Sequence, residues 1–128
     1  MEKRFLKKII AQTPKDLQII SAFCSEAMVK LDDIKYLPKN KLFLISLERL
    51  NKESKKKNKK INSIIKFEFI DSSKSININQ NNTDLSLQLL AINIFKKESN
   101  YEITLLFSDN GIITLSAEII EVTLEDQK

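Results

Sequence analysis

From residue 34 onward, the apolar side chains of this chain recur at every second position. The pattern is plainest over 64–70, where Lys66 and Glu68 separate isoleucine and phenylalanine, and it returns over 101–107. A period of two places one set of side chains on one face of a β-strand. The connections between these stretches are short, whereas parallel strands need a crossover of about a dozen residues. The sequence therefore predicts an antiparallel sheet over most of its length.

Near the N-terminus, the apolar residues instead follow the 3.6-residue period of an amphipathic helix. Thr13 suits the N-cap and Pro14 the first helical position, and Asp16 falls in the first turn, at the positive end of the helix dipole. The apolar positions are Leu17, Ile20, Cys24, Ala27, Met28 and Leu31. We therefore predict one helix over about residues 14–30.

The length and the number of these segments set the expected architecture. A chain of 128 residues fits a single domain spanning 1–128. Residues 42–47 are almost all apolar, which indicates a strand covered on both faces or one lining a barrel. The predicted fold class is α+β. It combines an antiparallel, strongly curled sheet or partly open barrel of about six to eight strands with one N-terminal amphipathic helix.

Local irregularities in the alternation carry further predictions. Leu89 and Ile92 lie on opposite parities of one strand, which is what a β-bulge produces. Asn110 and Gly111 lie between two alternating stretches and predict a hairpin with a type I′ turn, in which both residues have positive φ. The segment 117–126 fits either a strand or a helix, and its β-branched residues favour the strand.

Most of the positive charge lies in one short run. The net charge is +4 and residues 52–60 alone carry +5, so the remaining residues sum to −1. We expect an exposed basic connection over about 51–61. The run has no aromatic residue for base stacking and no arginine for bidentate contacts, so a solvated loop and a contact site for nucleic acid or another anion both stay open. Its lysines are Lys52, Lys55, Lys56, Lys57, Lys59 and Lys60.

Residues for the common catalytic sites are scarce. The chain has no histidine, and its one cysteine, Cys24, falls on the apolar side of the predicted helix, where a thiol is usually an inert small hydrophobe. Asp32 and Asp33 fit a turn. An enzyme would need several carboxylates to converge in a pocket, and the candidates are Asp33, Glu48, Glu68 and Glu121. No catalytic residue, metal site or cofactor is predicted.

Two other groups of polar residues have competing interpretations. Tyr36 and Arg49 lie on strands joined by a short turn, and an arginine beside a tyrosine can hold a carboxylate or a phosphate. The same two residues fit an ordinary cross-strand pair at the surface. The acidic residues near the C-terminus favour a solvated strand edge, where like charges discourage aggregation. They are Glu118, Glu121, Glu125 and Asp126.

These observations favour a cytoplasmic protein that acts by binding. No apolar run approaches the ~18–20 residues of a transmembrane helix, and the stretch 9–11 is too short for a signal peptide. We predict a small non-catalytic binding or interaction module with a protein partner. The alternative is a nucleic-acid-associated accessory protein that uses Lys52–Lys60. Homodimerisation through an exposed apolar strand is compatible with the same pattern.

Four stretches of the chain also carry a family resemblance. They read DLQIISA over 16–22, YLPK over 36–39, LSLQLLAINIF over 85–95 and EIIEVTLED over 118–126. In these stretches the chain resembles an uncharacterised family of small alphaproteobacterial proteins, domain of unknown function 2948. The resemblance implies a basic stretch near 52–60 but no activity. The family usually has an aromatic pair with tryptophan after an arginine like Arg49, whereas this chain has Leu50-Asn51.

Overall fold

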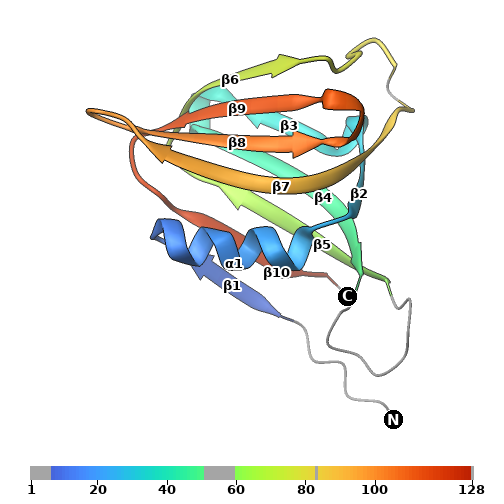
Figure 1. Ribbon diagram of the computed structural model, residues 1–128, viewed down its shortest axis with the longest axis horizontal. Helices are drawn as coiled ribbons and strands as arrows, with labels where there is room; N and C mark the ends of the chain where they lie inside the picture. Colours follow the sequence, from blue (N-terminus) through green and yellow to red (C-terminus); the bar gives the residue numbers. More distant parts are fainter. Residues whose placement is uncertain (1–6, 51–59, 83, 128) are drawn as a thin grey trace.

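The computed structural model describes residues 7–50, 60–82 and 84–127. Within these residues the chain forms one α-helix and a ten-stranded sheet in which every pairing is antiparallel (Figure 1). The elements are β1 (Lys8–Ala11), α1 (Pro14–Cys24), β2 (Ala27–Lys30), β3 (Ile34–Leu37), β4 (Leu42–Leu50), β5 (Lys60–Phe67), β6 (Ile70–Ile76), β7 (Ser86–Lys96), β8 (Tyr101–Phe107), β9 (Ile112–Ala117) and β10 (Val122–Asp126). The predicted α+β class is confirmed.

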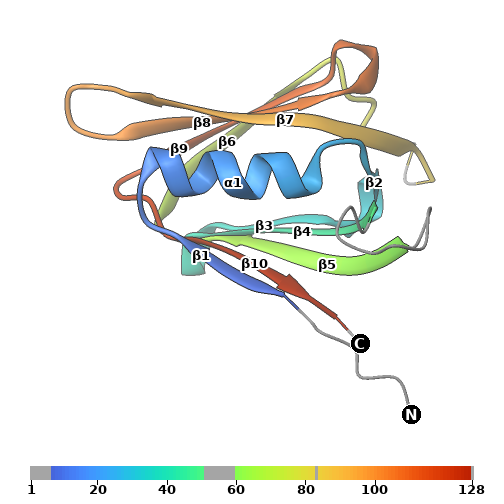
Figure 2. The same ribbon diagram turned by 60° about the horizontal axis from the view of Figure 1, so that its bottom comes forward.

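The predicted strand number and curvature are wrong. The strands follow the order β1-β10-β5-β4-β2-β7-β8-β9-β6, and β3, which is outside this order, pairs with β4. The two end strands, β1 and β6, do not pair with each other. The sheet is neither closed nor strongly curled. Figure 2 shows α1 lying between the strands β7 and β8 and the strands β3, β4 and β5. The helix thus fills the space that a closed barrel would fill with strand side chains.

The helix ends at Cys24, earlier than the predicted residue 30. Its start agrees with the prediction, because the Thr13 hydroxyl accepts a hydrogen bond from the Asp16 amide at 3.1 Å. After the helix, Glu26 has a φ of 70° and the chain enters β2, which pairs with β7 along its whole length and with β4 at Met28. The apolar residues at 27–31 fit both periods, and these long-range pairings select the strand.

The core combines one face of α1 with the inward residues of the strands. Leu17, Ile20 and Cys24 are buried on the helix, and the strands bury alternate residues, as in Phe43, Ile45 and Leu47 of β4. The bulge predicted in β7 is confirmed, because its register against β8 shifts between Leu89 and Ala91. In the described part of the chain, no helix is long and apolar enough to cross a bilayer.

The turn between β8 and β9 differs from the predicted one. Asp109 and Asn110 have positive φ, one position earlier than expected, and Gly111 has a φ of −71°. The glycine instead packs closely against Ile78, because a Cβ there would lie 3.1 Å from Cγ1 of Ile78 and that side chain would have to shift. Residues 122–126 form a strand, as favoured above, and residues 118–121 form the connection between β9 and β10.

Candidate functional site

Two strand edges face each other across a hollow, which we call the β3–β6 groove. β3 pairs only with β4, and β6 pairs only with β9, so each keeps one edge without a partner strand in the described part of the chain. The groove measures about 390 Å³. Its lining consists of Leu31, Ile34, Tyr36, Phe43, Ser73, Ser75, Ile78, Gln80 and Ile113. None of these side chains carries a charge.

The floor of the groove is apolar and well packed. Phe43 and Ile113 belong to the buried core, and Tyr36 and Ile78 pack against it from the groove side. The ring centroids of Tyr36 and Phe43 are 6.4 Å apart, and Phe43 in turn meets Phe67 edge-on at 5.9 Å. Small polar side chains from β6 form the opposite wall, since Ser73 and Ser75 point toward the groove. This lining suits the apolar side chains of an extended segment.

One end of the groove is held closed. The Ile70 amide donates a hydrogen bond to the Lys41 carbonyl at 2.9 Å, which joins the start of β6 to the turn between β3 and β4. The Lys41 ammonium also contacts Glu118 at 2.8 Å and Asp71 at 3.2 Å. Hydrogen bonds to Glu118 and then Asp71 raise the pKa of Lys41 above its ordinary value. From this end onward the two strands have no hydrogen-bonded pairing between them.

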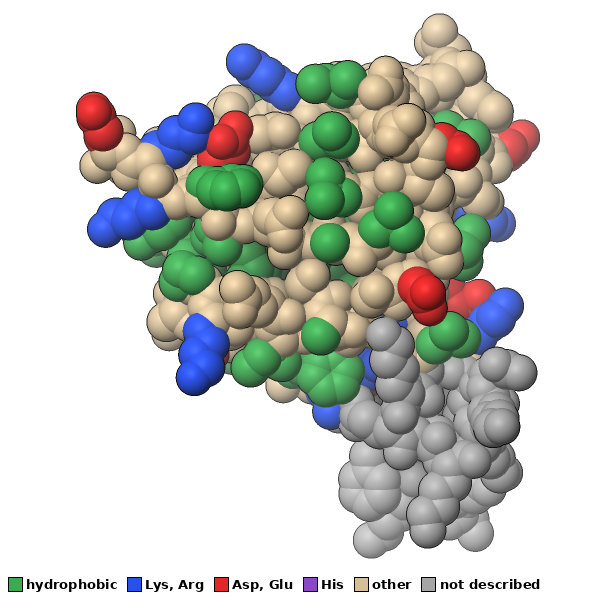
Figure 3. All heavy atoms as spheres, in the orientation of Figure 1, with side chains coloured by type: hydrophobic (Ala, Val, Ile, Leu, Met, Phe, Trp, Pro, Cys, Tyr) green, Lys and Arg blue, Asp and Glu red, His purple; other side chains and the backbone are tan. Residues whose placement is uncertain are grey.

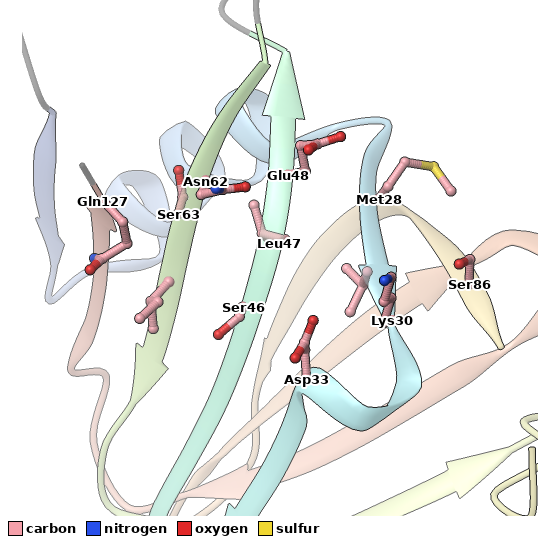
Figure 4. A pocket seen from close by; sticks show the side chains of 12 residues that line it. Met28, Lys30, Asp33, Ser46, Leu47, Glu48, Asn62, Ser63, Ser86 and Gln127 are labelled. Carbon is pink, nitrogen blue, oxygen red and sulfur yellow. The ribbon is translucent and has the colours of Figure 1, made fainter. Parts of the chain in front are cut away.

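A second hollow, of about 460 Å³, lies on the solvent-facing side of β2, β4 and β5 (Figure 4). Lys30 and Asp33 line its β2 side, and Ser46 and Glu48 line it from β4. The Glu48 carboxylate contacts the Lys60 ammonium at 3.4 Å. The charges here are mixed in sign and partly paired, so this outer hollow has no single ligand preference.

The four carboxylates considered for catalysis do not converge. Asp33 and Glu48 share the outer hollow, but Glu68 and Glu121 do not line it. The Glu121 carboxylate instead accepts a hydrogen bond from Gln12 at 3.0 Å. Among the residues that the structure describes, no three His, Cys, Asp or Glu side chains lie close enough to hold a metal ion.

The structure does not bring Tyr36 and Arg49 together. Tyr36 lies opposite Phe43, whereas Arg49 is six positions farther along β4, opposite Ile61 of β5. Six residues of a strand span roughly 20 Å. The Tyr36 hydroxyl lies 3.5 Å from the Ile70 carbonyl, at the closed end of the groove. Tyr36 is therefore a groove residue, and Arg49 belongs to a different part of the fold.

Arg49 forms a buried ion pair with Asp126 of β10. The side chains of Arg49 and Asp126 are 1% and 0% exposed, and Nη2 lies 2.7 Å from Oδ2. Nε donates to Oδ1 at 3.0 Å, and the Ser63 hydroxyl donates to the same oxygen at 2.7 Å. Arg49 also lies over the ring of Phe23, with Cζ 5.7 Å from the centroid. Its Nη1 has no hydrogen-bond partner in the described part of the chain.

These contacts hold Asp126 in its ionised form. Burial raises the pKa of its carboxyl, but hydrogen bonds from Arg49, Ser63 and the Lys7 amide outweigh burial, so the pKa lies below its ordinary value. The expectation that Asp126 joins a solvated acidic edge is wrong. The missed signal was parity, because Asp126 shares the inward positions of β10 with Val122 and Leu124. The network ties β10 to β4 and β5 and is part of the scaffold.

The lysine run falls mostly outside the described residues. Lys52, Lys55, Lys56, Lys57 and Lys59 lie in the segment 51–59, about which the structure says nothing further. Lys60 is the first residue of β5 and contacts Glu48. The proposed anion-contact role of the run therefore stays a prediction from sequence.

The outer face of the strands β6, β7, β8 and β9 carries a row of apolar side chains, which we call the apolar stripe. Register places Ile76 of β6, Ile112 of β9, Leu106 of β8 and Ala91 of β7 in one row across the four strands. Figure 3 shows a column of hydrophobic side chains on this face, among side chains that are mostly uncharged. Ile76 is 58% exposed. The stripe lies on the opposite face of β6 from Ser73 and Ser75, which line the groove.

The fold and the groove together define an α+β protein with an antiparallel sheet and an uncharged groove between two unpaired strand edges. The family model described as "Protein of unknown function (DUF2948)" matches residues 7–128, and the chain belongs to this family. No curated protein and no solved structure matches the chain.

Proposed function

We propose that this protein is a non-catalytic interaction module that binds an extended segment of another protein in the β3–β6 groove. The supporting observation is that β3 and β6 each present an unpaired strand edge to the same uncharged, partly apolar hollow. An extended peptide adds to such an edge through main-chain hydrogen bonds, and pockets for its alternate side chains give specificity. The bound segment would pair with β6 or β3 and direct every second side chain onto Tyr36 and Phe43.

Selection of random linear peptides displayed on phage tests this proposal. Ser73→Arg places a long charged side chain in the groove, whereas Ser72→Arg makes the same change at the neighbouring residue, which the alternation of β6 directs away from the groove. We expect the native protein and Ser72→Arg to enrich the same peptides and Ser73→Arg to lose them. Circular dichroism checks that both variants are folded. Enrichment that survives Ser73→Arg, or no enrichment by the native protein, would exclude the groove as the binding site.

Binding is also measurable in solution, on the full chain with one tyrosine replaced. The chain has no tryptophan and two tyrosines, Tyr36 and Tyr101. In a Tyr101→Phe variant, Tyr36 is the one remaining tyrosine, so the tyrosine fluorescence comes from a residue that lines the groove. A selected peptide that occupies the groove changes the emission of this variant, whereas a peptide bound at the outer hollow leaves it unchanged.

Homodimerisation and nucleic-acid binding, the other two proposals from the sequence, are each tested by a different measurement. A homodimer would use the apolar stripe, and light scattering before and after Ile76→Asp measures it. A nucleic-acid-associated role would use Lys52–Lys60, and it predicts salt-sensitive RNA binding that disappears when those lysines become glutamine. Peptide binding in the groove is independent of both results.

A further inference from the structure

The strands on either side of the groove carry the same outward charge. Lys35 lies between the groove-lining residues Ile34 and Tyr36 on β3, and Lys74 lies between the groove-lining residues Ser73 and Ser75 on β6. Because side chains alternate along a strand, both lysines point to the outer side of the groove. Both are exposed. Each strand edge thus presents uncharged side chains toward the groove and an ammonium group on its outer side.

Some lysines of this protein are paired with carboxylates, whereas Lys35 and Lys74 are among the described lysines that are not. The ammonium groups of Lys41, Lys60 and Lys97 each lie within 3.4 Å of a carboxylate. In the described part of the chain, neither Lys35 nor Lys74 makes such an ion pair. The one acidic residue of β6, Asp71, already contacts Lys41.

We propose, resting on the function proposed above, that the groove selects an extended segment in which apolar residues alternate with acidic ones. The apolar side chains of such a strand enter the groove, and its outward carboxylates lie between Lys35 and Lys74. A cross-strand pair of opposite charges stabilises a sheet, whereas like charges placed opposite each other destabilise it. The lysines therefore favour an acidic strand and disfavour a basic one.

Three synthetic peptides with identical apolar positions test this inference on the full chain. Their outward positions hold glutamate, serine or lysine, and their affinities are measured by Tyr36 emission in the Tyr101→Phe background. One exposed ion pair changes affinity by roughly threefold, so contacts with both lysines separate the glutamate and serine peptides by roughly tenfold, and like-charge repulsion weakens binding of the lysine peptide further. The difference shrinks as salt rises, because these charges are exposed.

The matched variants are two charge-equivalent double substitutions. Lys35→Gln with Lys74→Gln removes the proposed contacts, whereas Lys15→Gln with Lys96→Gln removes the same charge at exposed positions on α1 and β7. We expect only the first pair of substitutions to abolish the preference for glutamate while the serine peptide still binds.

The outcomes separate the inference from the proposed function. Equal affinities of the three peptides, with binding lost in Ser73→Arg, would overturn the acidic preference and leave the groove as the peptide site. A preference that persists in the Lys35→Gln/Lys74→Gln variant would also overturn it. If none of the three peptides binds and the phage selection yields none that does, the proposed function fails together with the inference.

Discussion

Replacement of Asp126 by asparagine removes one charge from a buried ion pair with almost no change in volume. The carboxylate accepts hydrogen bonds from Arg49 at 2.7 and 3.0 Å, from Ser63 at 2.7 Å and from the Lys7 amide at 2.9 Å. The guanidinium that remains is 1% exposed and has no other carboxylate to pair with in the described residues. Loss of one partner from a buried pair costs about 3–5 kcal/mol. Domains of this size have a free energy of unfolding of about 5–15 kcal/mol, so the expected loss is a large fraction of it.

Urea unfolding followed by circular dichroism measures this loss. The midpoint of the Asp126→Asn variant should fall strongly, while the slope of the transition stays close to that of the native protein. Glu125→Gln is the matched control, because it removes a carboxylate from the adjacent residue, which is exposed. We expect the control to shift the free energy of unfolding by less than about 0.5 kcal/mol.

A double variant separates charge burial from packing. Arg49→Met with Asp126→Leu removes both charges and keeps apolar volume, so it should be more stable than either single variant. The reasoning fails if Asp126→Asn loses less than about 1 kcal/mol, or if the double variant loses as much as the sum of the two single variants.

Three further perturbations have defined outcomes. The pKa of Asp126 is lower in the folded than in the unfolded chain, so its stabilisation is complete above the ordinary value of 3.8 and is lost as pH falls through the folded pKa. Melting temperatures measured from neutral pH down to strongly acidic pH should therefore fall more steeply for the native protein than for Asp126→Asn, and parallel curves would contradict this. Thr13→Ala removes the cap of α1 and should cost about 1 kcal/mol in chemical unfolding, whereas Thr13→Asp restores the acceptor. Gly111→Ala places a methyl group 3.1 Å from Cγ1 of Ile78, and we expect about 1 kcal/mol of destabilisation by calorimetry because Ile78 must move. An unchanged melting temperature would mean that Ile78 moves aside without a cost in stability.

Local sequence patterns predicted the features that depend on residues close together in the chain. The Thr13 cap acts within one turn, and the alternation over 101–107 appears in β8. The alternation over 64–70 holds in β5 only as far as Phe67, because Phe69 has a φ of 60° and is exposed while Ile70 is buried. The bulge in β7 followed from a change of parity between Leu89 and Ile92. Each of these signals lies within a short stretch of sequence, so it can be recognised without knowledge of the tertiary structure.

The errors occurred where distant segments decide the outcome. Residues 27–30 satisfy both the helical period and the strand period, and pairing with β4 and β7 makes them a strand. The same holds for the glycine, since its neighbour Ile78 is far away in the sequence. A local window contains neither partner, so no reading of it could choose between the alternatives.

Side-chain periodicity and capping are local properties, so the sequence alone shows that most of the chain forms antiparallel strands and that it contains one capped helix. Three features depend on the folded chain: which strands lie at an edge, the pairing of Asp126 with Arg49, and the groove between β3 and β6. Strand order depends on the summed packing and hydrogen bonding of segments far apart in the chain. The candidate site is a product of that order, since it consists of two edges that the remaining strands leave unpaired.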